Sequence, residues 1–433
     1  MPSNSSVFQA DRAHVFHSWS VQGALNPMVI QSGKGCKVWD YDGNEYLDFS
    51  SQLVNTNVGH QHPKMIAGIK AQADELLTIA PSIANHARNE AAKRIVDLAP
   101  DNFNKVFFTN GGADAVENAI RMARLYTGRD KVLSAYRSYH GNTGVAIATT
   151  GEPRRFSNEY ARGHVHFFIP YLYRSEFFAK TEEEECERAL AHLRSVIEFE
   201  GASSIGALIL ESVPGTAGVM IAPEGYMQGV RALCDEFGIM MIMDEVMAGF
   251  GRTGKWFAFE HYDGVVPDLI TFAKGVNSGY VPVGGVVISD AIADYFDDRM
   301  FPGGLTYSGH PLATASIVTC IDTMKEEGIV ENAANMGEVL KEKLAALARK
   351  HVGIGEVRGV GVFWVVELVS DRETRAKVPA KNMNRIKAGL IAKGLLPMIA
   401  DNRIHIVPPC IVTEAEIDQA LAILSEVLTD EQL

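Results

Sequence analysis

Short apolar segments alternate with helical patterns through the middle of the chain. Several of these segments are apolar at nearly every position, which is too continuous for a strand with one face in water. They fit the buried strands of a mostly parallel sheet that helices cover on both faces. The pattern therefore predicts an α/β fold with strands over 105–109, 131–136, 145–150, 205–211, 238–245, 268–273 and 284–289.

The two ends of the chain follow a different pattern. Near the start, the turn pair Asp42-Gly43 lies between two short apolar segments and predicts a hairpin. After Gly309, long helical patterns over 310–326 and 329–350 precede a mixture of short strands and helices. We expect a large domain over 66–317 and a smaller α+β domain over 318–433, which the N-terminal segment 1–65 joins.

Length and charge narrow the class of protein. The 433 residues exceed the usual size of a single core, which agrees with two domains. A net charge of −13 without a basic cluster argues against nucleic acid or an anionic membrane as partner and favours a small-molecule ligand. The sequence has no signal-peptide pattern and no long apolar segment, so we expect a cytoplasmic protein. The five cysteines are scattered and predict neither disulfides nor a metal site.

Two segments that follow predicted strands could form parts of a ligand site: one is rich in glycine, and the other contains a tyrosine. Gly111, Gly112 and Ala113 follow a predicted strand and open a helix, where backbone N–H groups and the helix dipole favour a phosphate. A Gly-Gly pair before a helix is also a common turn. Tyr139, next to His140, could place its ring against a flat cofactor, although a tyrosine at such a position, taken alone, is more often a core residue.

Two strand ends carry stronger signals. Asp244 ends one apolar strand and Lys274 ends another, and ligands of open α/β sheets bind at the carboxyl ends of strands. A lysine among small residues at the end of a buried strand is hard to explain as a solvated charge. A phosphate turn, an aromatic face, an acid and a lysine are the parts that pyridoxal 5′-phosphate (PLP) chemistry requires, with the lysine as imine partner.

Several motifs resemble the class III (ω-aminotransferase) family of fold-type I PLP enzymes over essentially the whole chain. They are VWDYDGNEYLDF, GHQHP, TNGGADAVENAIRMAR, YHGNT, LILESVPGTAGV, DEVMAGFGRTG, FAKG and TYSGHPLATA, in this order. The resemblance implies a mostly parallel seven-stranded sheet in the large PLP-binding domain. It also implies a homodimer or a dimer of dimers with active sites at the interface. The segments around Trp19 and Val54 look most similar to amine:pyruvate and taurine:pyruvate aminotransferases, which makes both residues candidate substrate contacts.

The resemblance also implies a role for each cofactor residue. Gly111, Gly112 and Ala113 would hold the PLP phosphate, together with Thr306 of a neighbouring subunit. Tyr139 and Val246 would cover the two ring faces, with His140 nearby. Asp244 would pair with the ring nitrogen, and Glu211 would support that side from behind. Lys274 would bond to PLP and then move a proton as general base and acid.

The family pattern breaks where a substrate carboxylate is usually bound. Many class III members have an arginine three residues before a Pro-Pro pair, and this position is His405 here. Arg403 would share its strand face and could substitute, or Arg162 or Arg174 could supply the cation. The amine:pyruvate branch often has an arginine near 397–399, and none occurs there. It remains equally open that Arg403 faces solvent and that His405 is a core histidine.

We therefore expect a transaminase that moves an amino group from a primary amine or ω-amino acid, such as taurine, to pyruvate or another 2-oxo acid. Another PLP reaction on the same fold remains an alternative: a phospho-lyase, a decarboxylase or an aminomutase. A non-catalytic sensor is disfavoured, because the N-terminal region has neither the length nor the basic charge of a DNA-binding appendage.

Overall fold

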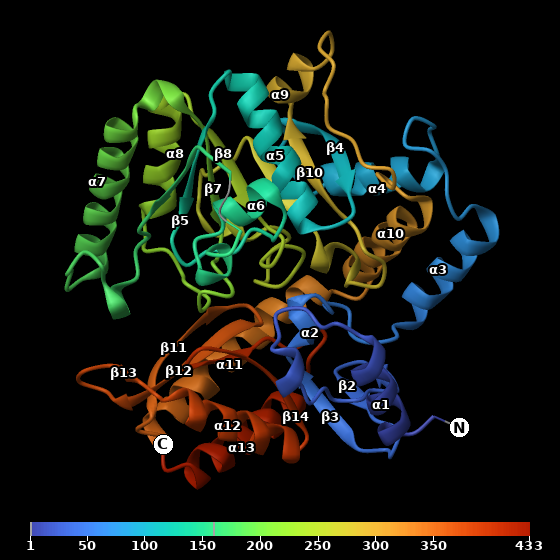
Figure 1. The fold of residues 1–433 in the computed structure, drawn as a ribbon, viewed down its shortest axis with the longest axis vertical. Coiled ribbons are helices and arrows are strands. Elements are labelled where there is room, and N and C mark those ends of the chain that lie inside the picture. Colours follow the sequence, from blue (N-terminus) through green and yellow to red (C-terminus); the bar gives the residue numbers. More distant parts are fainter. Residues whose placement is uncertain (1, 159–160) are drawn as a thin grey trace.

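The computed structural model describes residues 2–158 and 161–433, which form two lobes that are each built on one sheet (Figure 1). The larger sheet carries the continuously apolar segments of the sequence. Its strand order is β4-β10-β9-β8-β7-β5-β6. Neighbours from β9 to β6 run parallel, whereas β10 runs antiparallel to both β9 and β4. The predicted mostly parallel, seven-stranded α/β sheet is confirmed. Its strands are β4 (Phe103–Thr109), β5 (Lys131–Ala135), β6 (His164–Phe167), β7 (Ile205–Glu211), β8 (Met240–Asp244), β9 (Leu269–Phe272) and β10 (Gly284–Ser289).

Helices bury both faces of this sheet, which explains why its strands are apolar at consecutive positions. In β7, Ala207 and Ile209 pack on one face with α5 (Gly112–Thr127), while Leu208 and Leu210 face a second cluster on the other side. The second cluster includes side chains of α4 (His86–Val96), α7 (Glu182–Glu200), α8 (Tyr226–Phe237) and α10 (Pro311–Glu326). The remaining helices of this lobe are α3 (Pro63–Glu75), α6 (Gly144–Thr149) and α9 (Asp290–Tyr295).

The smaller sheet joins the two ends of the chain. The N-terminal strand β3 (Glu45–Phe49) pairs in parallel with β14 (Leu395–Ala400), with Leu47 opposite Leu395. The sheet order is β1-β2-β3-β14-β15-β12-β11, and β13 pairs with β12. The other strands are β1 (Ser32–Lys34), β2 (Lys37–Trp39), β11 (Ile354–Val360), β12 (Phe363–Asp371), β13 (Ala376–Lys377) and β15 (Arg403–Ile406), and the helices are α11 (Ile329–Lys350), α12 (Ala380–Ala392) and α13 (Glu414–Asp430).

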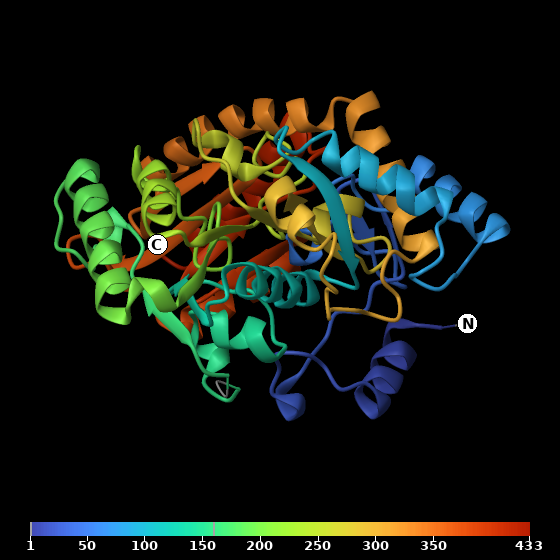
Figure 2. The same ribbon diagram turned by 90° about the horizontal axis from the view of Figure 1, so that it is seen from above.

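The first residues of the chain, up to the end of the first helix, lie at the periphery of the molecule (Figure 2). Its helix α1 (Asn4–His14) buries no residue, and α2 (Ser51–Val54) follows the hairpin of β2 and β3. The hairpin around Gly43 is thereby confirmed. Within residues 2–158 and 161–433, no helix has both the length and the apolar character needed to cross a membrane.

One predicted strand is wrong. Residues 145–150 were assigned to a strand, but Gly144–Thr149 form helix α6. The Glu117 carboxylate accepts hydrogen bonds from the Val145 and Ala146 backbone N–H groups and from the Thr143 hydroxyl, and so satisfies the start of this helix. A short apolar run does not reveal such a distant partner. The predicted domain boundaries at 65 and 317 stay predictions, and the second falls within α10.

Candidate active site

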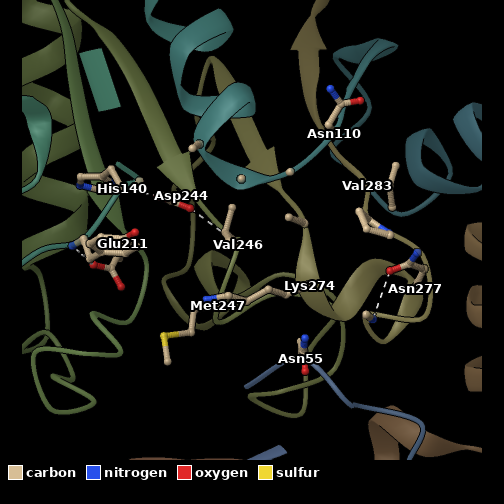
Figure 3. A pocket seen from close by; sticks show the side chains of 18 of the residues that line it. Asn55, Asn110, His140, Glu211, Asp244, Val246, Met247, Lys274, Asn277 and Val283 are labelled. Carbon is tan, nitrogen blue, oxygen red and sulfur yellow. Dashed lines mark hydrogen bonds and ion pairs between the residues drawn. The ribbon is translucent and has the colours of Figure 1, made fainter. Parts of the chain in front are cut away.

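A cavity of about 340 Å³ opens where the strands of the large sheet end (Figure 3). Glu211 and Asp244 close strands β7 and β8, and Lys274 follows β9 after one residue. The N-terminus of α5 lies at the same edge, because β4 leads directly into it. These four parts line one cavity, which is where open α/β sheets bind their ligands. The predicted strand-end residues are therefore brought together.

The glycine turn presents free backbone N–H groups to the cavity. Gly111, Gly112 and Ala113 line it, and no side chain in the described part of the chain caps the start of α5. A Cβ atom on Gly112 would lie 2.9 Å from Val246 Cγ1, which is closer than real Cβ contacts. Gly112 thus permits the close approach of the helix start to the Val246 side chain. The uncapped N–H groups and the helix dipole suit a phosphate.

Lys274 has an unusual backbone and an unpaired ammonium. Its φ of 45° lies in the left-handed region, which costs a residue with a Cβ about 1 kcal/mol or more. Its Nζ forms no hydrogen bond or ion pair with the described residues, and the side chain extends along the cavity in Figure 3. Burial lowers the pKa of the Lys274 ammonium, and the negative charges of Asp244 and Glu211 oppose this shift. A lowered pKa increases the fraction of neutral, nucleophilic amine.

Asp244 is held by its neighbours while it faces the cavity. Its Oδ2 atom lies 2.7 Å from Nδ1 of buried His140, and its Oδ1 accepts the Val246 N–H at 3.1 Å. The Nε2 atom of His140 is buried without a hydrogen-bond partner among the described residues. His140 and Val246 thus orient the carboxylate, which can hold a proton on a ring nitrogen of a bound cofactor.

Glu211 organises the loop that carries Tyr139. One carboxylate oxygen accepts the Tyr139 N–H at 3.0 Å, and the other accepts the Gly215 N–H at 2.9 Å. Burial raises the pKa of Glu211, and the charge of His140 opposes this. The Tyr139 ring lines the cavity, and the Arg154 guanidinium lies 3.8 Å from the centre of this ring. Arg154 was not among the predicted site residues.

The predicted substrate residues lie outside the lining of this cavity. Trp19 is exposed and contacts the Tyr139 ring edge-on, with 6.4 Å between ring centres. Val54 is buried in an apolar cluster, while its neighbour Asn55 lines the cavity. Thr306, which was predicted to reach the cofactor phosphate of a neighbouring subunit, is exposed at the surface. The substrate contacts of Trp19 and Val54 and the phosphate contact of Thr306 stay predictions.

His405 and Arg403 have different surroundings although they share one strand face. His405 is fully buried, with Nε2 3.1 Å from the Gly215 carbonyl oxygen, and burial lowers its pKa to about 4. His405 is therefore an uncharged residue at neutral pH. Arg403 lines a second cavity that adjoins the first, together with Arg174. The predicted alternative Arg162 forms no described contact with either cavity.

Four further polar or flexible side chains line the first cavity and were missed in the sequence: Asn55, Thr216, Met247 and Asn277. Asn277 is buried and donates to the Ser316 hydroxyl at 2.9 Å, and Asn55 arrives from the N-terminal segment. Their positions in the sequence are unremarkable, because only the fold brings them to the cavity. Thr216 lies in the motif ESVPGTAG, which was the one available signal.

A strand-end lysine beside a strand-end carboxylate and an uncapped helix start defines a PLP-type site. The family model for class-III aminotransferases matches residues 19–428, and the chain belongs to this family. Enzymes of this family use PLP, and the cavity has a fitting anion cradle, an unpaired lysine and a carboxylate. The chain is therefore a PLP-dependent aminotransferase of fold type I.

The chain is similar over nearly its whole length to characterised relatives and to solved structures. It is 34% identical to 4-aminobutyrate aminotransferase of Escherichia coli, over 93% of this chain and 94% of that protein. It is 33% identical to taurine–pyruvate aminotransferase of Rhodobacter capsulatus, over 95% and 94%. The crystal structure of taurine:2-oxoglutarate aminotransferase from Bifidobacterium kashiwanohense, solved with PLP and glutamate, superimposes with a TM-score of 0.96 at 42% identity, over 99% and 98% of the two chains.

Proposed function

We propose that this aminotransferase takes its amino group from a primary amine or an ω-amino acid, taurine-like or β-alanine-like, and transfers it to a 2-oxo acid. The observation that carries the proposal is His405, which occupies the position of the family's arginine. It is buried, bonded to a backbone oxygen, and uncharged because its pKa is lowered to about 4. Met398 stands in the segment where the amine:pyruvate branch often has its arginine. Neither position offers a cation to an α-carboxylate beside the donor amine.

The same proposal assigns roles to the residues of the cavity. Gly111, Gly112 and Ala113 would hold the phosphate of PLP through backbone N–H groups. Tyr139 and Val246 would lie against the ring faces, and Asp244 would hold a proton on the ring nitrogen. Bound PLP supplies an aldehyde that reacts with amines and a ring that accepts an electron pair.

Lys274 would carry the proton transfers. Its Nζ reaches into the cavity from the end of β9, and burial lowers its pKa. A neutral amine can accept a proton from the donor carbon and return it from the same atom. Between these two steps the amine is protonated. The negative charges of Asp244 and Glu211 stabilise this protonated form, because they oppose the lowering of the Lys274 pKa by burial. Lys274 thus combines the properties of a base and an acid at one position.

We further propose a homodimer or a dimer of dimers that shares active-site residues. Thr306 is exposed, as a residue that reaches a neighbour's phosphate must be. Large apolar side chains are exposed in the same region and on the N-terminal segment, namely Phe16, Trp19, Val21, Met300 and Tyr307. Contiguous exposed apolar side chains mark interaction surfaces, and we place the proposed dimer interface at these residues.

A matched pair of donors tests the proposed donor class. 5-Aminopentanoate and 2-aminopentanoate contain the same atoms and differ only in the position of the amine. With either pyruvate or 2-oxoglutarate as acceptor, we expect alanine or glutamate to form at least tenfold faster from 5-aminopentanoate. Taurine, β-alanine and 1-phenylethylamine extend the panel, and the Lys274→Ala variant gives the background. Faster reaction of the α-amino isomer would refute the proposed donor class.

A further inference from the structure

The turn that precedes α5 contains an asparagine followed by a glycine. Asn110-Gly111 is the only Asn-Gly pair in the sequence. Asn110 lies between the end of β4 and the start of α5, outside both elements, and lines the cofactor cavity (Figure 3). Its side chain is exposed and forms no hydrogen bond with the described residues. The side-chain amide of Asn110 is therefore free to meet the backbone that follows it.

The backbone nitrogen of Gly111 is open to attack by, or on, its neighbours. Gly111 has no Cβ, and a Cβ atom built there would meet nothing within 4 Å. Its N–H donates no hydrogen bond to the backbone of the described residues, whereas its carbonyl oxygen accepts the Thr109 hydroxyl at 2.9 Å. The 16-residue helix α5 begins at Gly112 without a side-chain cap. The positive end of a helix stabilises a negative charge, so it favours loss of the proton from this N–H.

We propose that Asn110 is a site of spontaneous deamidation, and that this modification removes the ability of the apoenzyme to bind PLP. The Gly111 nitrogen attacks Cγ of Asn110, so that a new C–N bond forms and the bond from Cγ to Nδ2 breaks. The Nδ2 group leaves as ammonia and takes the proton that the Gly111 nitrogen loses. Water then opens the cyclic imide at either carbonyl, which leaves aspartate or isoaspartate at position 110. Water is the only co-reactant, and nothing is oxidised or reduced.

The product places a carboxylate beside the backbone N–H groups of Gly111, Gly112 and Ala113. This carboxylate competes with a phosphate for the same N–H groups and repels its charge, and isoaspartate also lengthens the backbone of the turn by one carbon. An anion that accepts these N–H groups has the opposite effect, because it keeps the Gly111 nitrogen protonated and fixes the turn. The bound cofactor therefore protects Asn110, and only enzyme that has lost its cofactor is modified.

The test incubates the full-length apoenzyme and the holoenzyme side by side at mildly alkaline pH and follows both by peptide mapping with mass spectrometry. Deamidation adds about one mass unit to the peptide that contains Asn110. We expect this gain to be about tenfold or more slower in saturating PLP. A synthetic peptide of residues 107–115 gives the rate without the fold, which the apoenzyme should match or exceed. The internal control is Asn102, which is also exposed and lies in a turn but is followed by the bulky Phe103, and which should stay unmodified.

Two variants test the consequence for PLP. Asn110→Asp should raise the Kd for PLP roughly 10- to 100-fold in an absorbance titration, because a carboxylate then stands next to the phosphate site. Asn110→Gln keeps an amide but closes the imide ring far less readily, so it should gain no mass and keep its initial PLP affinity throughout the incubation. If Asn110→Asp does not fold, the deamidated wild-type protein, separated by ion exchange, takes its place in the titration.

Three results would overturn the proposal. They are an unmodified Asn110 in the apoenzyme while the peptide of residues 107–115 converts, equal rates in apoenzyme and holoenzyme, or wild-type PLP affinity in the deamidated protein. None of these measurements uses an amino donor or acceptor. Their outcome is therefore independent of the donor class proposed above.

Discussion

The contact between Gly112 and Val246 gives a sharp test of the phosphate turn. In Gly112→Ala the new methyl group would lie 2.9 Å from Val246 Cγ1 and 3.0 Å from Cγ2, whereas ordinary contacts begin at 3.4 Å. Alanine favours the helix that Gly112 starts, so the substitution should not harm α5 itself. Its cost arises from the displacement of either the turn or the Val246 side chain, and both line the cofactor cavity.

The expected magnitude follows from this overlap. Overpacking by one methyl group in a well-packed site costs about 1–3 kcal/mol, which corresponds to roughly 5- to 150-fold in an equilibrium constant. We expect the Kd for PLP, measured by absorbance titration of the apoenzyme, to rise by that factor. The thermal unfolding midpoint of the apoenzyme should change little, because the cavity can widen when PLP is absent.

A double-mutant cycle isolates the cause. The methyl group added in Gly112→Ala would meet the two Cγ methyl groups of Val246, and Val246→Ala removes both. The double variant should therefore recover most of the PLP affinity that Gly112→Ala alone loses. Val246→Ala alone should weaken PLP binding modestly. Unchanged PLP affinity in Gly112→Ala would contradict the steric argument, and a double variant as weak as the sum of both single variants would show that the two residues do not interact.

Three further predictions concern charge and pH. The pKa of His405 is lowered from 6.5 to about 4 in the folded protein. Between these two pH values the unfolded chain binds a proton at His405 and the folded chain does not, so the free energy of unfolding falls as pH drops from 6.5 towards 4. Urea unfolding at pH 6.5 and pH 5 should show about 2 kcal/mol less pH-dependent loss in His405→Asn. Arg252 is fully buried and donates hydrogen bonds to Val362, Pro408, Ser51 and Asn57, so Arg252→Met should destabilise the protein by about 3 kcal/mol, seen as a lower thermal midpoint at equal protein concentration. Lys274→Ala should abolish turnover in the alanine-formation assay while PLP still binds, reversibly and removable by dialysis.

The parts of the site that the sequence predicted are local. Lys274, Asp244 and the Gly111-Gly112 turn each stand at the end of an apolar strand or within two residues of it, and the carboxyl ends of parallel strands meet at one edge. Strand position and residue type were therefore sufficient to predict that these residues lie at one edge of the sheet. The antiparallel strand β10 could not be distinguished in the same way, since its sequence is as apolar as its parallel neighbours.

The parts that were missed depend on distant segments. Asn55 reaches the cavity from the N-terminal segment, and the pairing of Arg174 with Glu367 joins the two lobes. The sequence offered Arg403 as a candidate for an anion site, and Arg162 or Arg174 as the alternative. Only the folded arrangement shows that Arg174 lies 2.7 Å from the Glu367 carboxylate, whereas the Asp401 carboxylate is 3.7 Å from Arg403. Which charged side chains pair depends on the folded arrangement, and the spacing of residues along the sequence does not reveal it.

Arg252 shows how the cofactor loop is linked to the smaller lobe. Its Nη2 donates to Asn57 Oδ1 at 2.7 Å, and its other terminal nitrogen donates to the Pro408 and Val362 carbonyl oxygens. Asn57 in turn donates to the Phe250 carbonyl at 2.7 Å and packs against Gly275, where a Cβ atom would lie 2.4 Å from its Nδ2. Gly275 directly follows Lys274, whose left-handed backbone needs support from its surroundings. A movement that separates the lobes would leave a buried guanidinium unpaired and loosen that support, so the position of Lys274 depends on contacts far outside the cavity.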